Sequence, residues 1–411
     1  MRILYVVPYV PNLIRVRPYH FISQLAALGH HVTVVTLWME ERERADLEQL
    51  KKMTAAVHAI RLSPARSVWN CVWALPTRAP LQSAYGWQPK LAKRLGALQK
   101  EAMREARYDL VHVEHLRGAL YGMVFGSHPR ESDHRHPIVW DSVDCISRLF
   151  RQAARHAELR LSRWLSRFEL ARTETYEARL IRQFDRTLVS SPLDREALLS
   201  LYSPDGSPRP ISVISNGVDL EYFKPDSNLP RRPATIVMSG KMSYHANVTM
   251  TLRFVNEIMP RVWARRPDAR VTIVGKDPPR QIQALAKTPS IDVTGTVADI
   301  RPYLQSAALA VAPIVYGTGV QNKVLEAMAC STPVVASPPA ISGLNARAGR
   351  DILVESSPEG FAEAILGLVG DPSMAGRIGR AGRRYVEEQH SWKSKALQLE
   401  GVYREVANVR S

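Results

Sequence analysis

A glycine-rich turn followed by two charged residues is the part of the 411-residue sequence whose residue types best suit ligand chemistry. Within segment 312–336, an apolar strand pattern leads into Gly-Thr-Gly at 317–319, and a helical pattern begins near Val320. Glycines let backbone amides approach an anion, and the first turn of a helix offers unpaired N–H groups and a positive dipole. Lys323 adds a cation in that turn, and the carboxylate of Glu326 follows one turn later.

This arrangement predicts a phosphate site beside a carboxylate that accepts hydrogen bonds from ribose hydroxyls. A plain strand–turn–helix connection, with Lys323 and Glu326 in solvent, is the alternative that the segment alone leaves open. The elements around the turn therefore decide between the two interpretations.

Strand and helix patterns alternate through the first half of the chain. Buried-strand patterns at 3–7 and 31–36 flank a helical pattern at 17–28, which Gly29 ends. Further strand patterns follow at 56–62, 110–113, 138–141 and 187–190. Repeated strand–helix–strand units predict a parallel, doubly wound, Rossmann-like α/β sheet.

A stretch rich in Pro, Ser and Gly at 203–210 precedes a second series of strands and helices. Strand patterns in this series lie at 211–214, 235–238, 270–274, 291–294, 309–313 and 333–336. We therefore expect one Rossmann-like domain over 1–208 and another over 209–389, with a C-terminal helix in 390–411 that packs on the first domain. Ligands of such sheets lie beyond the carboxyl ends of the strands.

The composition of the chain limits the kinds of partner that it is expected to bind. A formal net charge of +16 favours polyanionic ligands or surfaces, but the basic residues are not interleaved with a nucleic-acid-binding motif. We expect phosphorylated ligands and peripheral contact with an anionic membrane, and no nucleic acid. No apolar run reaches the roughly 18 residues of a membrane span, so a cytoplasmic location is expected. Three separated cysteines without a C-x-x-C pair argue against disulfides and structural zinc.

Motifs in the second half of the chain resemble those of the retaining glycosyltransferases of the GT-B fold, in the large group called family 4. Residues 325–336, LEAMACSTPVVA, are similar to the donor-site signature of that group. Residues 214–219 are similar to its linker motif I-x-N-G-V-D, and residues 240–247 to its loop motif G-x-M-x-Y-x-P-N. The resemblance implies two Rossmann-like domains that face each other across a deep cleft, and a nucleotide-sugar as donor.

The resemblance also implies roles for individual residues. The implied donor-binding positions are Gly240, Lys241, Gly275, Val297, Thr318, Gly319, Val320, Lys323 and Glu326. Lys241 and Lys323 would counter the negative charge that builds on the diphosphate leaving group as the glycosidic bond breaks. With that role filled by lysines, no metal or other cofactor is expected, and no Asp-x-Asp motif lies near these loops.

One position departs from the family pattern. The family commonly carries a Glu, seven residues and a second Glu; the second is Glu326, but Thr318 occupies the first position. Because the first carboxylate usually faces the transferred sugar, Thr318 bears on donor-sugar identity and on activity itself. The chain is similar to a subset with a Gly-Thr/Ser-Gly turn, and to sugar transferases of exopolysaccharide and exosortase-associated clusters.

Glu114 and His115 follow a strand pattern and are further candidates for catalytic roles beside the two lysines. The family often has a His near the sugar at the position of Glu114, with His115 next to it here. The alternative is that these residues line a loop without contacting a ligand, with His112 as a hydrogen-bonded core residue.

Four other residues of the first domain are candidates for acceptor binding. Arg15 and Arg17, in the loop after the first strand, suit an acceptor phosphate, and solvated loop arginines are the alternative. Asp141 and Asp144 end another strand and suit acid–base chemistry or acceptor binding. Helix capping is the alternative for at least one of them.

The segment 67–87 is rich in aromatic residues, including Trp69 and Trp73, with arginines nearby. Such a composition suits a membrane interface or a lipid-linked acceptor. A hydrophobic flap that packs on the first domain is the alternative.

Three functions remain open at this point. The first is transfer of a sugar from a UDP- or GDP-sugar to a glycan or lipid-linked sugar hydroxyl, with retention of configuration, in bacterial-type polysaccharide biosynthesis. The second, prompted by Thr318, is a non-catalytic subunit that binds a nucleotide-sugar or glycan. The third is a sugar-nucleotide epimerase of the same architecture.

Overall fold

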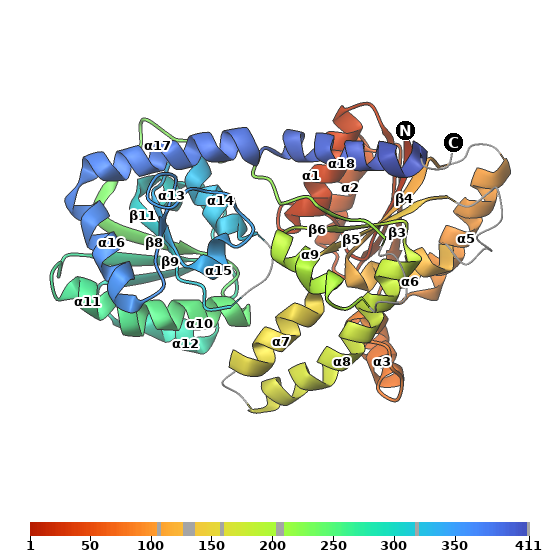
Figure 1. Ribbon diagram of the computed structural model, residues 1–411, viewed down its shortest axis with the longest axis horizontal. Coiled ribbons are helices and arrows are strands. Elements are labelled where there is room, and N and C mark those ends of the chain that lie inside the picture. Colours follow the sequence, from red (N-terminus) through yellow and green to blue (C-terminus); the bar gives the residue numbers. More distant parts are fainter. Residues whose placement is uncertain (105–107, 126–135, 157–159, 203–208, 317–319, 409–411) are drawn as a thin grey trace. The chain divides into compact units, whose positions relative to one another are not determined.

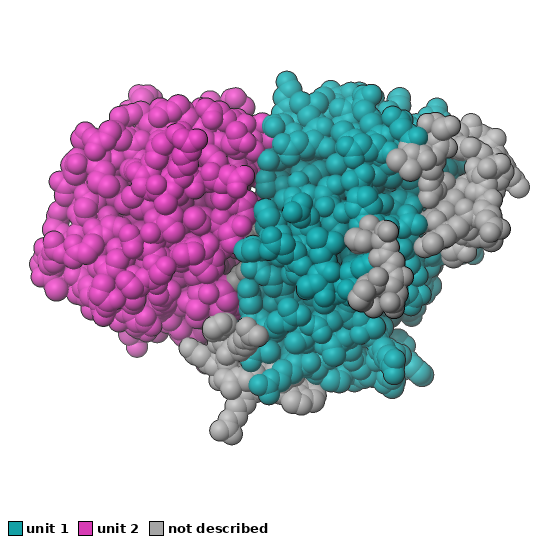
Figure 2. Space-filling model, viewed as in Figure 1, with its two compact units in different colours: residues 1–215, 392–411 teal, residues 216–391 magenta. Residues whose placement is uncertain are grey.

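The computed structural model describes residues 1–104, 108–125, 136–156, 160–202, 209–316 and 320–408. Two compact units make up the chain (Figure 2). Unit 1 comprises Met1–Ser215 and Trp392–Ser411, and unit 2 comprises Asn216–Ser391. Each unit is an α/β domain built on a parallel sheet, as the alternation of patterns predicts.

Unit 1 holds a seven-stranded sheet with the order β3-β2-β1-β4-β5-β6-β7, in which every neighbouring pair is parallel. Its strands are β1 (Arg2–Val7), β2 (His31–Trp38), β3 (Ala56–Arg61), β4 (Leu110–Glu114), β5 (Ile138–Val143), β6 (Arg186–Val189) and β7 (Ile211–Val213). Successive strands run outward from β1 to β3 and then from β4 to β7, so the direction of winding reverses between β1 and β4.

Helices cover both faces of this sheet (Figure 1). They are α1 (Val16–Ala27), α2 (Glu43–Met53), α3 (Pro64–Ala74), α4 (Leu81–Tyr85), α5 (Pro89–Arg104), α6 (His115–Phe125), α7 (Ile146–His156), α8 (Arg160–Gln183), α9 (Pro192–Leu199) and α18 (Trp392–Asn408). α1 and α18 pack together over one hydrophobic cluster, and α5 and α6 pack together over the other. Among the described residues, no helix has both the length and the apolar character needed to cross a membrane.

The border between the units differs from the expected division at residues 208 and 209. β7 follows the Pro- and Gly-rich stretch but pairs with β6, so it extends the sheet of unit 1. Such a composition interrupts helices and strands both within domains and between them, so composition alone places the border only approximately. The C-terminal helix α18 belongs to unit 1, where it packs on α1.

Unit 2 holds a six-stranded parallel sheet with the order β10-β9-β8-β11-β12-β13. Its strands are β8 (Arg232–Ser239), β9 (Arg270–Val274), β10 (Ile291–Gly295), β11 (Ala307–Ala312), β12 (Val334–Ala336) and β13 (Leu353–Val354). Its helices are α10 (His245–Arg253), η1 (Phe254–Ile258), α11 (Met259–Trp263), α12 (Arg280–Gln283), η2 (Ala284–Lys287), α13 (Arg301–Ser306), α14 (Asn322–Ala329), α15 (Pro338–Ile341), α16 (Pro358–Gly370) and α17 (Pro372–Gln389). A single large apolar cluster surrounds the sheet, and the winding reverses between β8 and β11.

Candidate functional site

The carboxyl ends of β8 and β11 meet at the point where the winding of unit 2 reverses. A crevice forms there in open α/β sheets, because the connections leave the two strands in opposite directions. β8 ends at Ser239 and leads into Gly240, and β11 ends at Ala312, upstream of α14. Most of the residues that the sequence proposes as a donor site, among them Gly240, Lys241, Lys323 and Glu326, therefore follow one of the two strands that flank this point.

Gly240 and Gly275 bring two neighbouring strand ends into very close contact. Gly240 has a φ of +146°, which favours glycine, and its amide donates to the carbonyl of Val274 at 3.1 Å. A Cβ on Gly275 would lie 1.7 Å from the carbonyl oxygen of Gly240, so no larger residue fits. The tight contact shapes the backbone next to Lys241.

Asn247 connects this loop to Lys323 on α14. The Lys323 ammonium donates to Asn247 Oδ1 at 2.5 Å, and Asn247 Nδ2 donates to the carbonyl of Lys241 at 2.9 Å. A Cβ on Gly240 would lie 3.4 Å from Lys323 Nζ, so the ammonium lies directly against the glycine backbone. Asn247 thus holds the cation beside the loop that follows β8.

Burial shifts the ionisation of both charged residues on α14. It lowers the pKa of Lys323 to about 8, although the charge of Glu326 opposes this effect. It raises the pKa of Glu326 to about 7, and the charge of Lys323 partly offsets that rise. Neither side chain is simply solvated, so the alternative of a plain connection with two exposed charges does not describe this site. An anionic ligand beside Lys323 would favour its charged form.

Two further pairs of polar or aromatic residues each include a residue close to Lys241 or Lys323 in the chain. His245 Nδ1 lies 2.8 Å from the Tyr316 hydroxyl, and the two rings stack with their centroids 5.5 Å apart. Asn216 Nδ2 donates to Asn322 Oδ1 at 3.0 Å at the first residue of α14. Tyr316 is the last described residue before the Gly-Thr-Gly turn.

The remaining proposed donor residues fall into two groups. Lys241 is exposed; Gly275 directly follows β9, Val297 lies two residues after β10, and Val320 is buried two residues before α14. Thr318 and Gly319 lie outside the described residues. Their roles stay predictions, as does that of the whole donor set.

In unit 1 a buried polar network lies on one face of the sheet, near the end of β4. Glu114 Oε2 accepts a hydrogen bond from the Tyr5 hydroxyl at 3.0 Å and lies 3.3 Å from His112 Nε2. His112 Nδ1 lies 2.7 Å from the hydroxyl of Tyr403, which α18 supplies. Glu114 Oε1 is buried without a hydrogen-bond partner. Burial, with the charge of Asp141, raises the pKa of Glu114.

Arg17 and Asp141, two candidates for acceptor binding, pair with each other in this unit. Arg17 Nε donates to Asp141 Oδ2 at 2.8 Å, and a second N–H donates to Oδ1 at 3.2 Å. Both side chains are buried, and Arg17 also donates to the carbonyl of Ile214 at 2.9 Å. Arg15 instead pairs with Glu43, 3.0 Å away. The Arg17–Asp141 pair therefore joins α1 to β5, and the bond from Arg17 to Ile214 links both to the end of β7.

His115 and Asp144 lie at strand ends with unusual backbone geometry nearby. His115 has a φ of +63°, and Val143 a φ of +67°, which costs free energy for residues with a Cβ. Burial and the charge of Arg117 lower the pKa of His115 to about 3. Burial and the charge of Asp194 raise the pKa of Asp144 to about 7, and Ser190 donates to this carboxyl at 3.0 Å.

His112, Glu114 and Asp141 bring one ligand atom each within 4.8 Å of one another. Most of their oxygens and nitrogens are already engaged: Arg17 takes both oxygens of Asp141, and Tyr5 and His112 share Glu114 Oε2, while Glu114 Oε1 has no hydrogen-bond partner. A cation would have to displace Arg17, and we assign none to this group.

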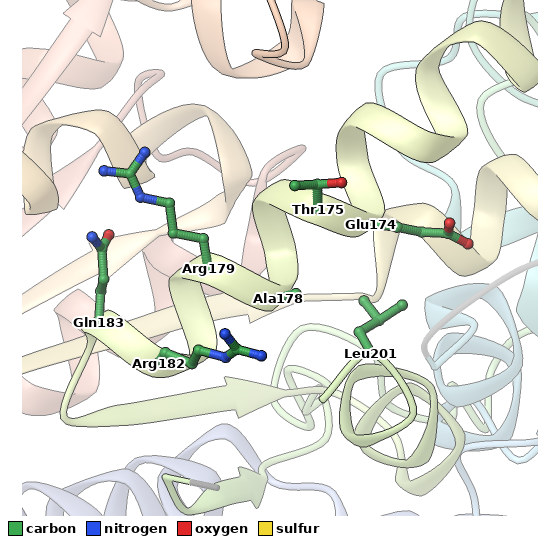
Figure 3. A pocket seen from close by; sticks show the side chains of 7 residues that line it. All are labelled: Glu174, Thr175, Ala178, Arg179, Arg182, Gln183 and Leu201. Carbon is green, nitrogen blue, oxygen red and sulfur yellow. The ribbon is translucent and has the colours of Figure 1, made fainter. Parts of the chain in front are cut away.

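A separate hollow of about 670 Å³ lies in unit 1 along α8. Its lining includes Arg179, Arg182 and Leu201 (Figure 3). None of the residues that the sequence proposes for ligand binding lines it. We therefore assign this hollow no part in the chemistry at the strand ends of either unit.

Sequence reasoning gave no role to three residues that organise these sites. Asn247 stands in the loop motif quoted above, so its place in that motif was the available signal. Tyr5 and Tyr403 carry no such signal, because each looks like an ordinary apolar position of a strand or a helix. Their partners lie 109 and 291 residues away, respectively.

Comparisons with known families and proteins bear on the family and the fold. The family description "Glycosyltransferase Family 4" matches residues 15–222, and "Glycosyl transferases group 1" matches residues 233–371. Alpha-maltose-1-phosphate synthase of Mycobacterium tuberculosis is 30% identical over 53% of this chain and 62% of its own length. An MMP alpha-(1->4)-mannosyltransferase of Mycolicibacterium hassiacum is 26% identical over 75% of this chain and 73% of its own. The chain thus spans about six tenths of the first of these relatives.

Solved structures share the fold at low sequence identity. Sucrose-phosphate synthase from Thermosynechococcus elongatus has a TM-score of 0.69 and 19% identity, over 99% of both chains. Anabaena HepE in complex with UDP and glucose has a TM-score of 0.68 and 14% identity, over 98% of this chain and all of that one. The two parallel-sheet units are those of the GT-B fold, and with the first family description covering residues 15–222, half of the sequence, the chain belongs to glycosyltransferase family 4.

Proposed function

We propose that the chain transfers a sugar from a UDP- or GDP-sugar to a hydroxyl of a glycan or lipid-linked sugar, with retention of anomeric configuration. The acceptor class and a role in bacterial-type polysaccharide biosynthesis follow from the motif resemblance. Such a reaction takes place in the cytoplasm, with peripheral contact at the inner face of the membrane.

The arrangement of Lys323 carries this proposal. Its ammonium lies against the backbone of Gly240, held by Asn247, where the winding of the unit 2 sheet reverses. A diphosphate at this point meets Lys323 and the amino end of α14 together. Lys241, exposed in the adjoining loop, adds a second positive charge. The two lysines neutralise the leaving group, so the proposal includes no metal.

Two similar proteins support the choice of donor. Anabaena HepE has been solved in complex with UDP and with UDP-glucose, and a relative from Corynebacterium glutamicum is called a GDP-mannose-dependent mannosyltransferase. In this chain Glu326, one turn after Lys323, would accept hydrogen bonds from the ribose of either nucleotide, since both share that ribose. Residues other than Lys323 and Glu326 would recognise the base and the sugar.

Unit 1 would supply the contacts to the transferred sugar and the acceptor. Glu114 offers a buried carboxylate oxygen without a partner, and His115 stays neutral at physiological pH because its pKa is lowered to about 3. A neutral imidazole and a carboxyl group suit hydrogen bonds to sugar hydroxyls. The pairing of Arg17 with Asp141 favours a positioning role for both beneath these residues.

A donor screen tests the proposal. The full chain is mixed with UDP, GDP and their common sugar nucleotides, and its melting temperature is measured. A nucleotide at about 100 times its dissociation constant adds about 2.7 kcal/mol of stability, so the true donor should raise the melting temperature clearly. The stabilising sugar nucleotides are then incubated with lipid-linked and free glycan acceptors, and the anomeric configuration of the product is determined by NMR.

We expect a nucleoside diphosphate to be released only when an acceptor is present, with the donor's anomeric configuration kept in the product. Nucleotide binding without turnover for any acceptor would instead indicate the non-catalytic binding subunit. Conversion of the donor to its epimer without an acceptor would indicate the epimerase. Absence of binding by every nucleotide would rule out the transferase, the epimerase and a subunit that binds nucleotide-sugars, and would leave only a glycan-binding subunit.

A further inference from the structure

Helix α3 turns its apolar side outward. Val68, Trp69, Val72 and Trp73 are 62%, 56%, 51% and 63% exposed, and they recur at the spacing of one helical face. Leu75, directly after the helix, is 47% exposed. The rings of the two tryptophans contact each other, with centroids 5.7 Å apart. We name these five residues the α3 apolar face.

The side of α3 that faces the protein is polar or small. Ser67 and Ala74 are buried there, and Asn70 donates to the carbonyl of Trp87 at 2.7 Å. A surface helix ordinarily buries its apolar stripe and exposes its polar one. α3 does the reverse, so the packing of the core does not explain why the α3 apolar face is exposed.

Contacts with α8 hold α3 in this orientation. Arg172 donates to the carbonyls of Ala74 and Ala79 at 3.4 Å each, and also to the carbonyl of Leu75. Glu169 accepts a hydrogen bond from the amide of Leu81, at the start of α4. α3 accordingly projects from unit 1 next to α8 as an anchored element (Figure 1).

The exposed charges of the sequence segment that holds this face are basic, and an acidic neighbour, Glu169 of α8, is buried. Residues 51–100, which include all of α3, α4 and most of α5, contain Lys and Arg but not a single Asp or Glu. Arg61, Arg78 and Lys90 are among the exposed basic residues of this stretch. Basic residues near the surface of an anionic bilayer are attracted to its headgroups.

We propose that the α3 apolar face inserts into the interface of an anionic lipid bilayer, with basic residues next to it in the chain, such as the exposed Arg78, contacting the lipid headgroups. Tryptophans favour the boundary between headgroups and acyl chains, because the indole combines an apolar ring with an N–H donor. Helix insertion and electrostatic attraction together give reversible, peripheral binding.

Area favours lipid over a second copy of the chain. A helix of this length is about 16 Å long and about 10 Å wide, far short of the roughly 800 Å² per partner that stable protein interfaces bury. A narrow apolar helix in a segment whose charged residues are all basic suits a fluid anionic lipid surface better than a flat partner of matching shape.

Sedimentation with lipid vesicles tests the inference on the full chain. Vesicles of phosphatidylcholine alone are compared with equimolar phosphatidylcholine and phosphatidylglycerol, and no nucleotide is added. We expect the chain to bind the anionic vesicles preferentially. The double variant Trp69→Ser, Trp73→Ser should lower its partition coefficient about tenfold or more. Val72→Asp, which keeps both tryptophans, should also weaken binding.

Leu397→Ser is the matched control, because Leu397 is 45% exposed on α18 of the same unit. It should bind vesicles like the unaltered chain, and melting curves check that each variant is folded. Equal binding by the double variant and the control, or no binding by the unaltered chain, would overturn the inference. So would a dimer that the double variant converts to a monomer without any effect on vesicles.

The inference does not depend on sugar transfer, since vesicle binding is read without donor or acceptor. Its failure would remove the membrane contact from the proposed function but would leave the proposed sugar transfer untouched, and failure of sugar transfer would leave the vesicle result untouched.

Discussion

Replacement of Lys323 by Ala should reduce the rate of sugar transfer by about 100- to 1,000-fold, the range found when one group that stabilises developing charge is removed. The ammonium lies 2.5 Å from Asn247 Oδ1 and directly against the Gly240 backbone, where the proposed diphosphate would lie. Charge on the diphosphate grows as the glycosidic bond breaks, so the loss should fall more on kcat than on KM.

Lys287→Ala provides the control for this substitution. Lys287 is exposed at the end of η2 in the same unit, and its removal changes the net charge equally. Its transfer rate should match that of the unaltered chain. An equal loss in both variants would assign the effect to overall charge, and no loss in Lys323→Ala would remove Lys323 from the site.

The pH dependence of kcat/KM in the unaltered chain should also reveal the role of Lys323. Burial lowers the pKa of Lys323 to about 8, so the free protein loses this positive charge as the pH rises past that value. Burial raises the pKa of Glu326 to about 7, so its carboxylate forms as the pH rises through 7. The kcat/KM for donor should therefore be largest between about pH 7 and 8. In Lys323→Ala the decline above pH 8 should disappear.

Gly275→Ala should be the most destabilising single substitution near the site. Its Cβ would lie 1.7 Å from the Gly240 carbonyl oxygen, and the nearest atoms are all Gly240 backbone, which cannot move aside as a flexible side chain would. Overpacking of this kind costs about 3 kcal/mol or more of unfolding free energy. Urea denaturation should show a lower midpoint, and nucleotide affinity should fall as well, because Gly240 adjoins Lys323.

Gly367→Ala separates steric strain from a general effect of added methyl groups. Gly367 lies within α16, and a Cβ there would have nothing within 4 Å. Alanine is a better helix former than glycine by about 1 kcal/mol, so this variant should be unchanged or slightly more stable. Equal stability of the Gly275 and Gly367 variants would show that β8 and β9 can separate at their ends without cost.

The two sheets and the ends of their strands could be predicted from the sequence because the signals are local. Strand and helix patterns repeat over a few residues, and the spacing of Lys323 and Glu326 on one helix follows from the helical period. The strand order that brings β8 next to β11 is also expected for alternating strands and helices.

Partners that are distant in the chain could not be predicted in the same way. Arg17 finds Asp141 across 124 residues, and Tyr403 finds His112 across 291. Such choices depend on which buried polar groups remain unsatisfied after the elements pack, and no local pattern records that outcome. The orientation of α3 shows the same limit: its composition suited both a buried flap and an exposed face, and contacts from Arg172 select the exposed one.

A crystal structure of the full chain with bound UDP or GDP tests the central claim most directly. The claim predicts the diphosphate at the carboxyl ends of β8 and β11, with phosphate oxygens within hydrogen-bond distance of Lys323 Nζ and a ribose hydroxyl against Glu326. A diphosphate bound elsewhere, with Lys323 still paired to Asn247 alone, would contradict it.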